Sequence, residues 1–478
     1  MTTEALTTAT PSPAIQRVLP WLVAVALFME SLDTTILNTA VPIVAKAIGT
    51  TPLGMKAVLA SYTLSLAVFI PISGWMADRF GTRRVFASAI GIFTFGSLLC
   101  GLMSNIHLLV ACRVLQGCGG AMMVPVGRLT LVRSFPKSQL IRAMSFVAIP
   151  ALVAPMLGPA AGGFIVAYFH WRAIFFLNVP VGIAGLVLVW MKLPDYRERT
   201  RPLDIVGLIL FGAGLALLSY VLEVFGEHAL SAAEILGLLF VSIALLFGYG
   251  VHAERTRWPL LRLGLFRIRS FAAAVGGGFF TRLGIGGVPF LLPLLYQVGL
   301  GFSPVQSGLL IMPQAAAAMS TKIVIRQILQ RFGYRTVLIG NTLLMSVFLM
   351  LFAAIGTGTP VWLIVVQAFC YGALTSTQYT CMNTLAYADV SPAKASAASS
   401  IASTSQQLSI SFGVAIAGLA TMFFVPPAAR SSPLDMIHGL HHAFLALGLF
   451  TMVSTVVFSR LRREDGADET RQKDIHLG

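Results

Sequence analysis

Long apolar stretches, each about the length of a helix that crosses a lipid bilayer, dominate this sequence. A span needs about 20 apolar residues, and fourteen stretches qualify. Only 11% of the 478 residues are charged, against about 25% in soluble proteins, so lipid must be the solvent for most of the chain. The stretches lie near 18–44, 55–77, 85–104, 107–132, 142–168, 173–192, 203–223, 232–251, 270–298, 303–326, 336–356, 361–387, 395–422 and 440–460.

Each stretch is expected to be an α-helix, because lipid cannot satisfy the hydrogen-bonding groups of an open backbone. A transmembrane barrel is excluded, since barrel strands alternate apolar and polar residues whereas these stretches are continuously apolar. The sequence therefore predicts an all-α integral membrane protein. Residues 1–17 are expected to form a short disordered cytoplasmic arm, and residues 461–478 a cytoplasmic tail.

The basic residues are distributed unevenly between the two sides of the membrane. If the N-terminus is cytoplasmic, four of the 33 Lys and Arg fall outside and two fall within spans, which leaves 27 on the cytoplasmic side. This bias predicts that both termini are cytoplasmic. The net charge is +15, but it is spread over short loops, so we expect no nucleic-acid partner. The exceptions are Lys46, Lys56, Arg172 and Arg430 outside, and Arg113 and Arg282 within spans.

The pattern R-F-G-x-R occurs twice, at residues 79–83 after the second span and at residues 331–335 after the tenth. If these spans correspond, two six-helix bundles, 18–192 and 270–460, flank an inserted pair of helices at 203–251. Parallel repeats with a binding site between the halves, near the bilayer midplane, are one plan for secondary transporters.

Four further motifs lie in the first half: LDTTILNTAVP (32–42), GWMADRFGTRR (74–84), RVLQG (113–117) and GPAAGG (158–163). With them the sequence resembles the major facilitator superfamily, and more narrowly its fourteen-helix drug:proton antiporters of the EmrB/QacA type, over residues 18 to 460. Ala154 departs from the pattern, because the family has a glycine there. The resemblance implies a major facilitator fold in a bacterial inner membrane and proton-coupled multidrug efflux by alternating access.

Three charged residues interrupt the first and fourth spans, where a charge is costly and is a functional candidate by default. Glu30 and Asp33 are three residues apart and share one helix face, so the pair can hold and release a proton as its exposure alternates. Arg113 needs a carboxylate or backbone acceptors when buried. The alternative is a purely structural ion pair. The resemblance implies that Asp33 is the acid of the first-helix motif and links Arg113 to proton transfer.

Two motifs are candidates for controlling the conformational change. By resemblance, residues 74–84 form a cytoplasmic latch in which Asp78 would favour the positive N-terminal end of a neighbouring helix, although a simple orientation signal is the alternative. The antiporter motif at 158–163 allows close helix approach and a bend, and by resemblance it seals antiporters against leak; ordinary packing is the alternative. The residues concerned are Gly74, Asp78, Arg79, Gly81, Arg83 and Arg84, and Gly158, Pro159, Gly162 and Gly163.

Arg282 interrupts the ninth span and allows three interpretations. It pairs with Glu30 or Asp33 across a central cavity, contacts an anionic or zwitterionic substrate, or reaches to the membrane interface. The C-terminal half has no acid deep in any span. We therefore expect proton coupling to be confined to the N-terminal half, and divalent cationic drugs to be poor substrates.

Other polar groups carry weaker signals. His438, His441 and His442 are interpreted as a solvated loop cluster rather than a metal site. Residues 171–180 are interpreted as an interfacial aromatic anchor. The sequence has no HExxH site and no G-K-[ST] phosphate loop, so we expect neither an enzyme nor an ATP-driven pump, and no cofactor apart from protons as the coupling ion.

The sequence thus predicts a proton-coupled exporter of small, lipophilic molecules that acts in the lipid bilayer. We expect a monomer that works either alone or together with a periplasmic adaptor. One alternative is an exporter of a specific metabolite or of an anionic or zwitterionic compound. The other is a membrane sensor that keeps the fold without transport.

Overall fold

The computed structural model describes residues 13–135, 137–198, 200–225, 230–391, 394–424, 433–462 and 464–465. These residues form helices and contain no strand, so the predicted all-α fold is confirmed. Most of the expected arm and tail, at 1–12 and 466–478, lies outside the described residues, as does Arg430. The long helices are α1 (Pro13–Ala47), α2 (Lys56–Phe80), α3 (Thr82–Leu102), α4 (Ile106–Ser134), α5 (Lys137–Tyr168), α7 (Asn178–Lys192), α8 (Ile205–Val224), α9 (Ala232–Arg255), α11 (Gly278–Pro293), α12 (Pro304–Leu351), α13 (Val361–Ala388), α14 (Ala395–Phe424) and α15 (Pro433–Phe458).

Short helical pieces connect or extend the long helices. Two of them, η2 and η3, are π-helical turns on either side of α11, so that Arg269–Gly299 forms one continuous span. The short pieces are α6 (Ala173–Phe176), α10 (Arg269–Ala272), η1 (Leu263–Arg267), η2 (Ala273–Gly277), η3 (Leu294–Gly299) and η4 (Phe352–Ala354).

Several helices begin at residues that satisfy their free backbone N–H groups. Ser303 forms a capping box with Gln306 at the start of α12, where Pro304 occupies the first helical position. A proline is tolerated there because its missing N–H would have no partner inside the helix. Asn105 caps α4 in a similar way.

Twelve helical segments of the described residues are long and apolar enough to cross a membrane. One of them, Pro304–Ala354, is 51 residues long and changes direction at Gly333, whose φ of 72° is not helical. In α5 only the shorter segment Val153–Tyr168 qualifies as an apolar helix. The predicted fourteen spans divide Pro304–Ala354 in two and include α5, and their exact number stays a prediction.

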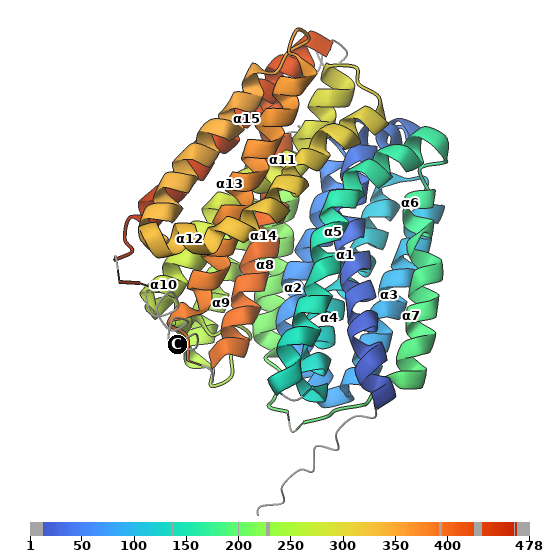
Figure 1. Ribbon diagram of the computed structural model, residues 1–478, viewed down its shortest axis with the longest axis vertical. Coiled ribbons are helices and arrows are strands. Elements are labelled where there is room, and N and C mark those ends of the chain that lie inside the picture. Colours follow the sequence, from blue (N-terminus) through green and yellow to red (C-terminus); the bar gives the residue numbers. More distant parts are fainter. Residues whose placement is uncertain are drawn as a thin grey trace, which may run out of the picture.

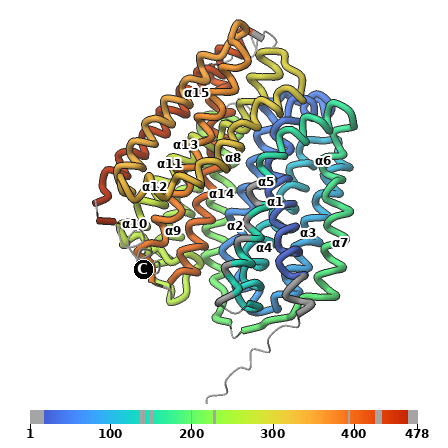
Figure 2. Tube along the Cα trace, in the orientation of Figure 1, coloured from blue at the N-terminus to red at the C-terminus, as the bar shows by residue number. Residues whose placement is uncertain are grey.

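The long helices form two groups that lean against one another (Figure 1). The first group, α1–α7, is blue to green, and the second group, α10–α15, is yellow to red. They meet where α5 contacts α12, α2 contacts α14 and α1 contacts α11. α8 packs against both α2 and α14, and α9 packs on α8 (Figure 2). The predicted division into bundles 18–192 and 270–460 around the pair 203–251 remains a proposal.

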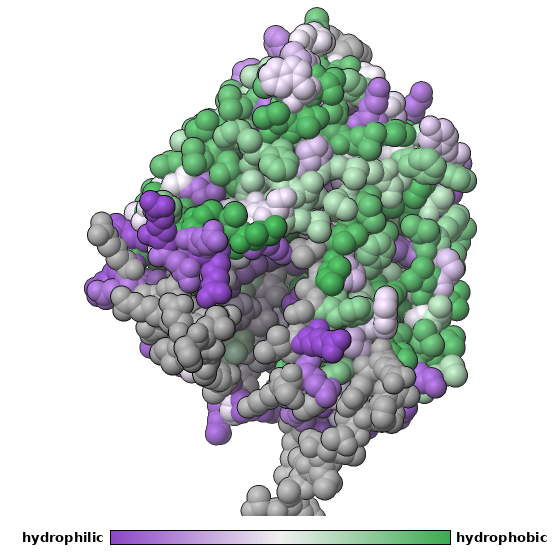
Figure 3. All heavy atoms as spheres, in the orientation of Figure 1, coloured by the Kyte–Doolittle hydropathy of each residue, from purple (hydrophilic) through white to green (hydrophobic). Residues whose placement is uncertain are grey.

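The outer surface is that of a membrane protein. Figure 3 shows hydrophobic residues over most of one face, with hydrophilic residues gathered toward its lower edge. The pair of α8 and α9 is especially exposed. In α9, 17% of the most apolar 18-residue stretch is buried, whereas 83% of the corresponding stretch in Arg269–Gly299 is buried. Because large exposed apolar surfaces are rare on soluble monomers, lipid must cover α9, while α11 lies inside the molecule.

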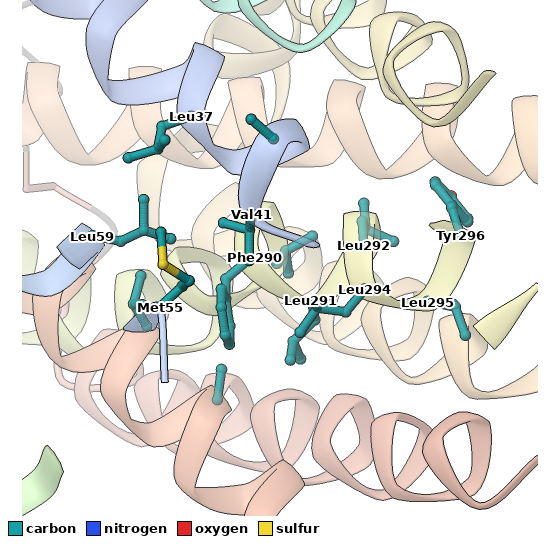
Figure 4. Close-up of a cluster of buried hydrophobic side chains, with 14 of the residues drawn as sticks. Leu37, Val41, Met55, Leu59, Phe290, Leu291, Leu292, Leu294, Leu295 and Tyr296 are labelled. Atoms are coloured by element: carbon teal, nitrogen blue, oxygen red, sulfur yellow. The ribbon is translucent and has the colours of Figure 1, made fainter. Parts of the chain in front are cut away.

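One buried apolar cluster joins the two groups at a single end of the molecule. In Figure 4, Val41 of α1 lies close to Phe290 of α11, and Leu37 of α1 lies near Leu59 of α2 and Met55, the residue before α2. A hydrogen bond of 2.8 Å from Gln297 Nε2 to the carbonyl oxygen of Thr39 lies beside this cluster. This end of the molecule, which we call the closed end, therefore excludes water between the groups.

The two copies of R-F-G-x-R both break a helix at their glycine. Gly81 lies between α2 and α3 with φ of 97°, and Gly333 lies within α12 with φ of 72°. A side chain is strained at such angles, whereas glycine is not. The repeated motif therefore corresponds to the same local change of chain direction in both halves.

Candidate functional site

Asp33 of α1 lies at the centre of a buried polar network. Its Oδ2 accepts a hydrogen bond from Arg113 Nη1 of α4 at 2.5 Å. Its Oδ1 accepts hydrogen bonds from Gln116 Nε2 at 2.9 Å and from Asn178 Nδ2 of α7 at 3.0 Å. All four side chains are buried. Removing two charges from water is costly, and these donors compensate the carboxylate because hydrogen bonds to ionised groups are strong.

The guanidinium of Arg113 packs on aromatic rings. Its Cζ lies 4.3 Å from the ring centroid of Tyr62 and 6.0 Å from that of Phe175, a stacking that suits its planar shape. Nη1 also donates to Gln116 Oε1 at 2.8 Å, while Nε is buried and has no hydrogen-bond partner among the described residues. Within the described residues Asp33 is the one carboxylate in an ion pair with Arg113. Neutralising Asp33 would therefore leave this cation without a counter-ion.

Glu30 lies one turn before Asp33 and stays outside the network. It is partly buried, and its carboxylate accepts one hydrogen bond in the described structure, from Ser31 Oγ at 3.5 Å. The charges of Asp33 and Arg128 act on it at longer range. The two predicted acids thus share a helix, but of the two only Asp33 forms an ion pair with Arg113 within the described residues.

Two partners of Asp33 were not assigned from the sequence. Gln116 follows Arg113 by three residues and so lies on the same helix face. Asn178 belongs to the 171–180 stretch that was interpreted as an interfacial anchor. That interpretation is incomplete, because the Asn178 side chain is buried and binds Asp33. The available signal was an amide within an apolar stretch, which has the same need for a partner as a charge.

The latch motif is held by the segment that follows α7. An added Cβ on Gly81 would run into the carboxylate of Asp195, whose Oδ1 accepts a hydrogen bond from the backbone N–H of Arg83 at 3.2 Å. Asp78 pairs with Arg133 of α4, with 2.6 Å between Oδ1 and Nη2. In this conformation Asp78 pairs with a side chain in the last turn of α4, and its contact with a helix N-terminus stays a prediction. The exposed members of the motif are Gly74, Arg79, Phe80 and Arg84.

The antiporter motif lies where α5 meets one helix from each group. An added Cβ on Gly163 would run into the backbone carbonyl of Pro304 in α12, and one on Gly308 of α12 would run into the carbonyl of Pro159 in α5. Such an approach of two backbones requires residues without side chains. We call this contact the α5–α12 seam. The motif glycines whose added Cβ would meet α1 instead are Gly158 and Gly162.

A cavity of about 420 Å³ lies between the two groups and is called the central cavity below. α1 and α5 line one side, and α11, α12 and α13 line the other. Its size falls in the range of small-molecule sites. Apolar lining residues include Pro155, Leu292 and Ile311, and the one charged lining residue is Lys322. Sequence reasoning missed Lys322, since it lies near the predicted end of a span.

Arg282 lies directly behind the wall of the central cavity. Its Nη2 donates to Asn383 Oδ1 at 2.9 Å, and its Cζ lies 5.2 Å from the ring centroid of Tyr379. Asn383 and Tyr379 both line the cavity. Arg282 is only 4% exposed and forms no ion pair within the described residues. The structure thus shows neither the predicted pairing with Glu30 or Asp33 nor a side chain that reaches the interface, and the substrate contact stays a prediction.

Other candidates are weaker. A cavity of about 460 Å³ between α1, α3 and α7 is lined by apolar residues alone, so nothing in it would orient a polar ligand. The three histidines lie in α15 rather than in the predicted loop, and His441 Nε2 is 2.8 Å from the carbonyl oxygen of Ile355. A helix rather than a loop forms here because apolar residues surround the histidines on both sides.

The lipid-facing helices, the two groups and the cavity between them define a multi-pass helical membrane transporter. The family model described as Major Facilitator Superfamily matches residues 23–414 and 276–477. The chain belongs to this superfamily, and the resemblance predicted from the motifs is confirmed.

Relatives and solved structures agree with this membership. A provisionally named multidrug resistance protein MdtD from Serratia proteamaculans (strain 568) is 39% identical over 96% of this chain and 96% of its own. Its counterpart from Pectobacterium atrosepticum is 40% identical over 94% and 96%. The crystal structure of a D-xylose–proton symporter matches with a TM-score of 0.66 at 14% identity, over 94% of this chain and 99% of that one. A bacterial homologue of the human lysosomal transporter Spinster, in an inward-facing conformation, has a TM-score of 0.64 at 15% identity, over 97% and 99%.

Proposed function

We propose that this protein is a secondary transporter that exports small, lipophilic molecules in exchange for protons. The buried contact between Asp33 and Arg113 carries the proposal, because it places a carboxylate that can accept a proton against a cation with no other ion-pair partner within the described residues. The relatives are provisionally named as multidrug resistance proteins, and these names support drugs as the cargo.

Helix α1 provides a direct connection between proton and substrate. Asp33 lies in the polar network, and Thr35 and Asn38, only a few residues further along α1, line the central cavity. Protonation of Asp33 removes its charge and weakens its hold on Arg113, Gln116 and Asn178. A shift of α1 relative to α4 and α7 then changes the cavity wall, so that substrate and proton compete through one helix.

Alternating access supplies the direction of transport. The closed end and the α5–α12 seam shut the cavity on the side opposite the Gly81 turn. If both termini are cytoplasmic, as the distribution of basic residues predicts, the present conformation faces the cytoplasm. The Asp78–Arg133 pair lies wholly within the first group here, and we propose that the latch contacts the second group when the cytoplasmic side closes.

The remaining features of the proposal follow from the sequence. The protein would act as a monomer in a bacterial inner membrane, with protons as its coupling ion and without a cofactor. It would work either alone or together with a periplasmic adaptor. Transport driven by a pH gradient in liposomes without ATP would agree with this scheme, whereas a requirement for ATP would contradict it.

Reconstitution in liposomes tests the proposal. An imposed pH gradient should drive transport of lipophilic dyes by the wild type, and Asp33→Asn, which is neutral like the protonated acid, should abolish that transport. Asp389→Asn, at an exposed carboxylate after α13, serves as the matched control and should transport normally. Unchanged gradient-driven transport by Asp33→Asn would refute the coupling role. A wild-type protein that binds dyes but moves neither dye nor protons would instead be a sensor.

A further inference from the structure

We infer that the central cavity selects molecules that carry an acidic group, so that the cargo is a lipophilic anion or zwitterion. This inference rests on the proposed function for the use of the cavity and adds the chemical class of the substrate. It depends on three independent features of the cavity: its charge, its free hydrogen-bond donors and its apolar walls.

The charge of the cavity is positive without compensation. Lys322 is the one charged residue in its lining, and no Asp or Glu contributes to it. Behind the wall, Arg282 is buried and forms no ion pair within the described structure, and its side chain donates to the neutral amide of Asn383 and lies against the ring of Tyr379. A guanidinium that is removed from water without a carboxylate is costly. An anionic group bound near Lys322 would therefore lower the free energy of both cations.

Arg282 acts on the substrate through the residues in front of it. Its hydrogen bond to Asn383 Oδ1 uses the acceptor of that amide, which leaves the Asn383 NH₂ as a donor at the cavity wall. Tyr379 also lines the cavity, and its ring centroid lies 5.2 Å from Cζ of the cation. Arg282 is thus a positioning residue, whereas Lys322 is placed to contact the substrate itself.

Two further polar groups of the lining lack partners. Gln314 Nε2 and Thr39 Oγ1 are buried, and neither has a hydrogen-bond partner within the described structure. Both residues line the cavity. Buried donors without partners are rare because each one costs free energy, and both of these groups can donate to a carboxylate or sulfonate oxygen. A cationic drug, which has no acceptor lone pairs to offer at its charged centre, would leave the amide donor unsatisfied.

The shape of the cavity determines the remainder of the molecule. Three prolines, Pro155, Pro159 and Pro289, together with Leu292 and Ile311, form apolar walls. A volume of about 420 Å³ has room for one or two rings together with an acidic group. The acid of the neighbouring network, Asp33, is enclosed by its own donors, so it offers no counter-charge to a cationic substrate.

Binding of a matched pair of fluorescent probes to the purified full-length protein tests this inference. Dansylglycine carries a carboxylate, and its amide has the same shape without the charge. One ion pair with a charge-assisted hydrogen bond corresponds to a preference of about tenfold or more. We expect the wild type to bind dansylglycine at least about tenfold more tightly than the amide, by titration and by competition.

Variants of Lys322 assign the preference to the cavity. Lys322→Gln should reduce the preference to less than about threefold without weakening amide binding, and Lys322→Arg should retain most of it. Lys46→Gln, which removes an exposed cation from the end of α1, controls for net charge and should have no effect. Arg282→Gln should lower the preference only in part, provided that its thermal unfolding shows a folded protein.

Equal affinity of the wild type for the two probes, tighter binding of the amide, or no saturable binding of dansylglycine would each overturn the inference. Loss of the preference in Lys46→Gln as well would also overturn it. The test is independent of proton coupling. If Asp33→Asn still transports, the proposed function fails while the charge preference stands. If gradient-driven export of neutral dyes is normal and the preference is absent, only the inference fails.

Discussion

Arg113 Nη1 lies 2.5 Å from Asp33 Oδ2, and each of these side chains is only 1% exposed. The contact joins α4 to α1 inside the first group of helices. Its two charges depend on each other, because neither forms another ion pair within the described residues. A proton that arrives at Asp33 therefore changes the stability of this conformation as well as the charge of one residue.

The dependence of the two charges predicts an asymmetric effect of mutations on stability. Asp33→Asn leaves the guanidinium buried without a counter-ion, and removal of one partner of a buried pair costs about 3–5 kcal/mol. Asp33→Asn combined with Arg113→Gln removes both charges and should recover much of that loss. Thermal unfolding in detergent measures both variants, with Glu30→Gln as a control that should be near the wild type. Additive losses in the double variant would contradict the prediction.

Gly163 at the α5–α12 seam leads to a prediction about conformation. Gly163→Ala places a Cβ against the Pro304 carbonyl, so the two helices must separate. We expect a longer mean distance between spin labels at the exposed positions Phe169 and Leu309, and faster proton leak in liposomes without substrate. Gly91→Ala is the control, because an added Cβ there meets no atom within 4 Å. Unchanged distances in Gly163→Ala would show that the seam can absorb a side chain.

The backbone conformation of Gly333 leads to a prediction about stability, in which a substitution costs free energy through backbone strain alone. An added Cβ meets no atom within 4 Å, but φ of 72° and ψ of 162° lie in a region that is essentially restricted to glycine. Gly333→Ala should therefore lower the free energy of unfolding by about 1–3 kcal/mol. Gly340→Ala, in the same helix with equally open surroundings, should be neutral or slightly stabilising. The two thermal midpoints decide the matter, and equal midpoints would refute the backbone explanation.

Features that depend on local sequence could be predicted from the sequence. Apolar length alone predicts the spans, since lipid leaves the backbone few alternatives to a helix. The two R-F-G-x-R turns follow from the glycine in each copy. A contact between the acids of the first span and Arg113 could be predicted, because a buried charge needs a partner and the spans contain few other charges. It was one of two interpretations of these residues, the other being proton transfer.

Features that depend on the packing of distant segments could not be predicted. Asn178 is 145 residues from Asp33, and nothing local distinguishes it from an interfacial amide. Asp78 was assigned to a helix N-terminus, and the structure shows that it forms an ion pair with the side chain of Arg133, which is distant in the sequence. To predict the surroundings of Arg282, one would need to know which face of α13 packs against α11. Sequence pattern gives the need for a partner, whereas tertiary structure decides which partner meets it.

The hydrogen bonds of Asp204 lead to a prediction about how the stability of the protein depends on pH. Burial raises its pKa, but hydrogen bonds from His252 and from the backbone N–H groups of Gly207 and Leu260 outweigh burial, so its pKa lies below the usual value. A lowered pKa contributes stability above the unfolded value of about 3.9, and that contribution is lost as the pH falls through the folded value. The advantage of the wild type over Asp204→Asn should thus shrink as the pH falls below about 4.

Thermal midpoints of Asp204→Asn between pH 3.5 and pH 7 measure this effect, with Asp389→Asn as the control for an exposed carboxylate. The asparagine can still cap α8 with its one oxygen but cannot also accept from Leu260, so the change of its midpoint with pH, rather than the midpoint itself, reports the loss of charge. An advantage that grows as the pH falls below about 4 would have the wrong sign and would contradict the assignment.

The α5–α12 seam joins backbone to backbone, and this sets how motion spreads through the transporter. Main chains that touch directly have no rotamers with which to absorb a small displacement, so the two groups must tilt there as stiff bodies. Lys322 lies 18 residues beyond Pro304, or about 27 Å along a helix with a rise of 1.5 Å per residue. With the seam as a fulcrum, a tilt of about 10° would move Lys322 by about 5 Å over that lever arm. A slight rocking at one end is thereby amplified into a displacement comparable with the width of a substrate at the other.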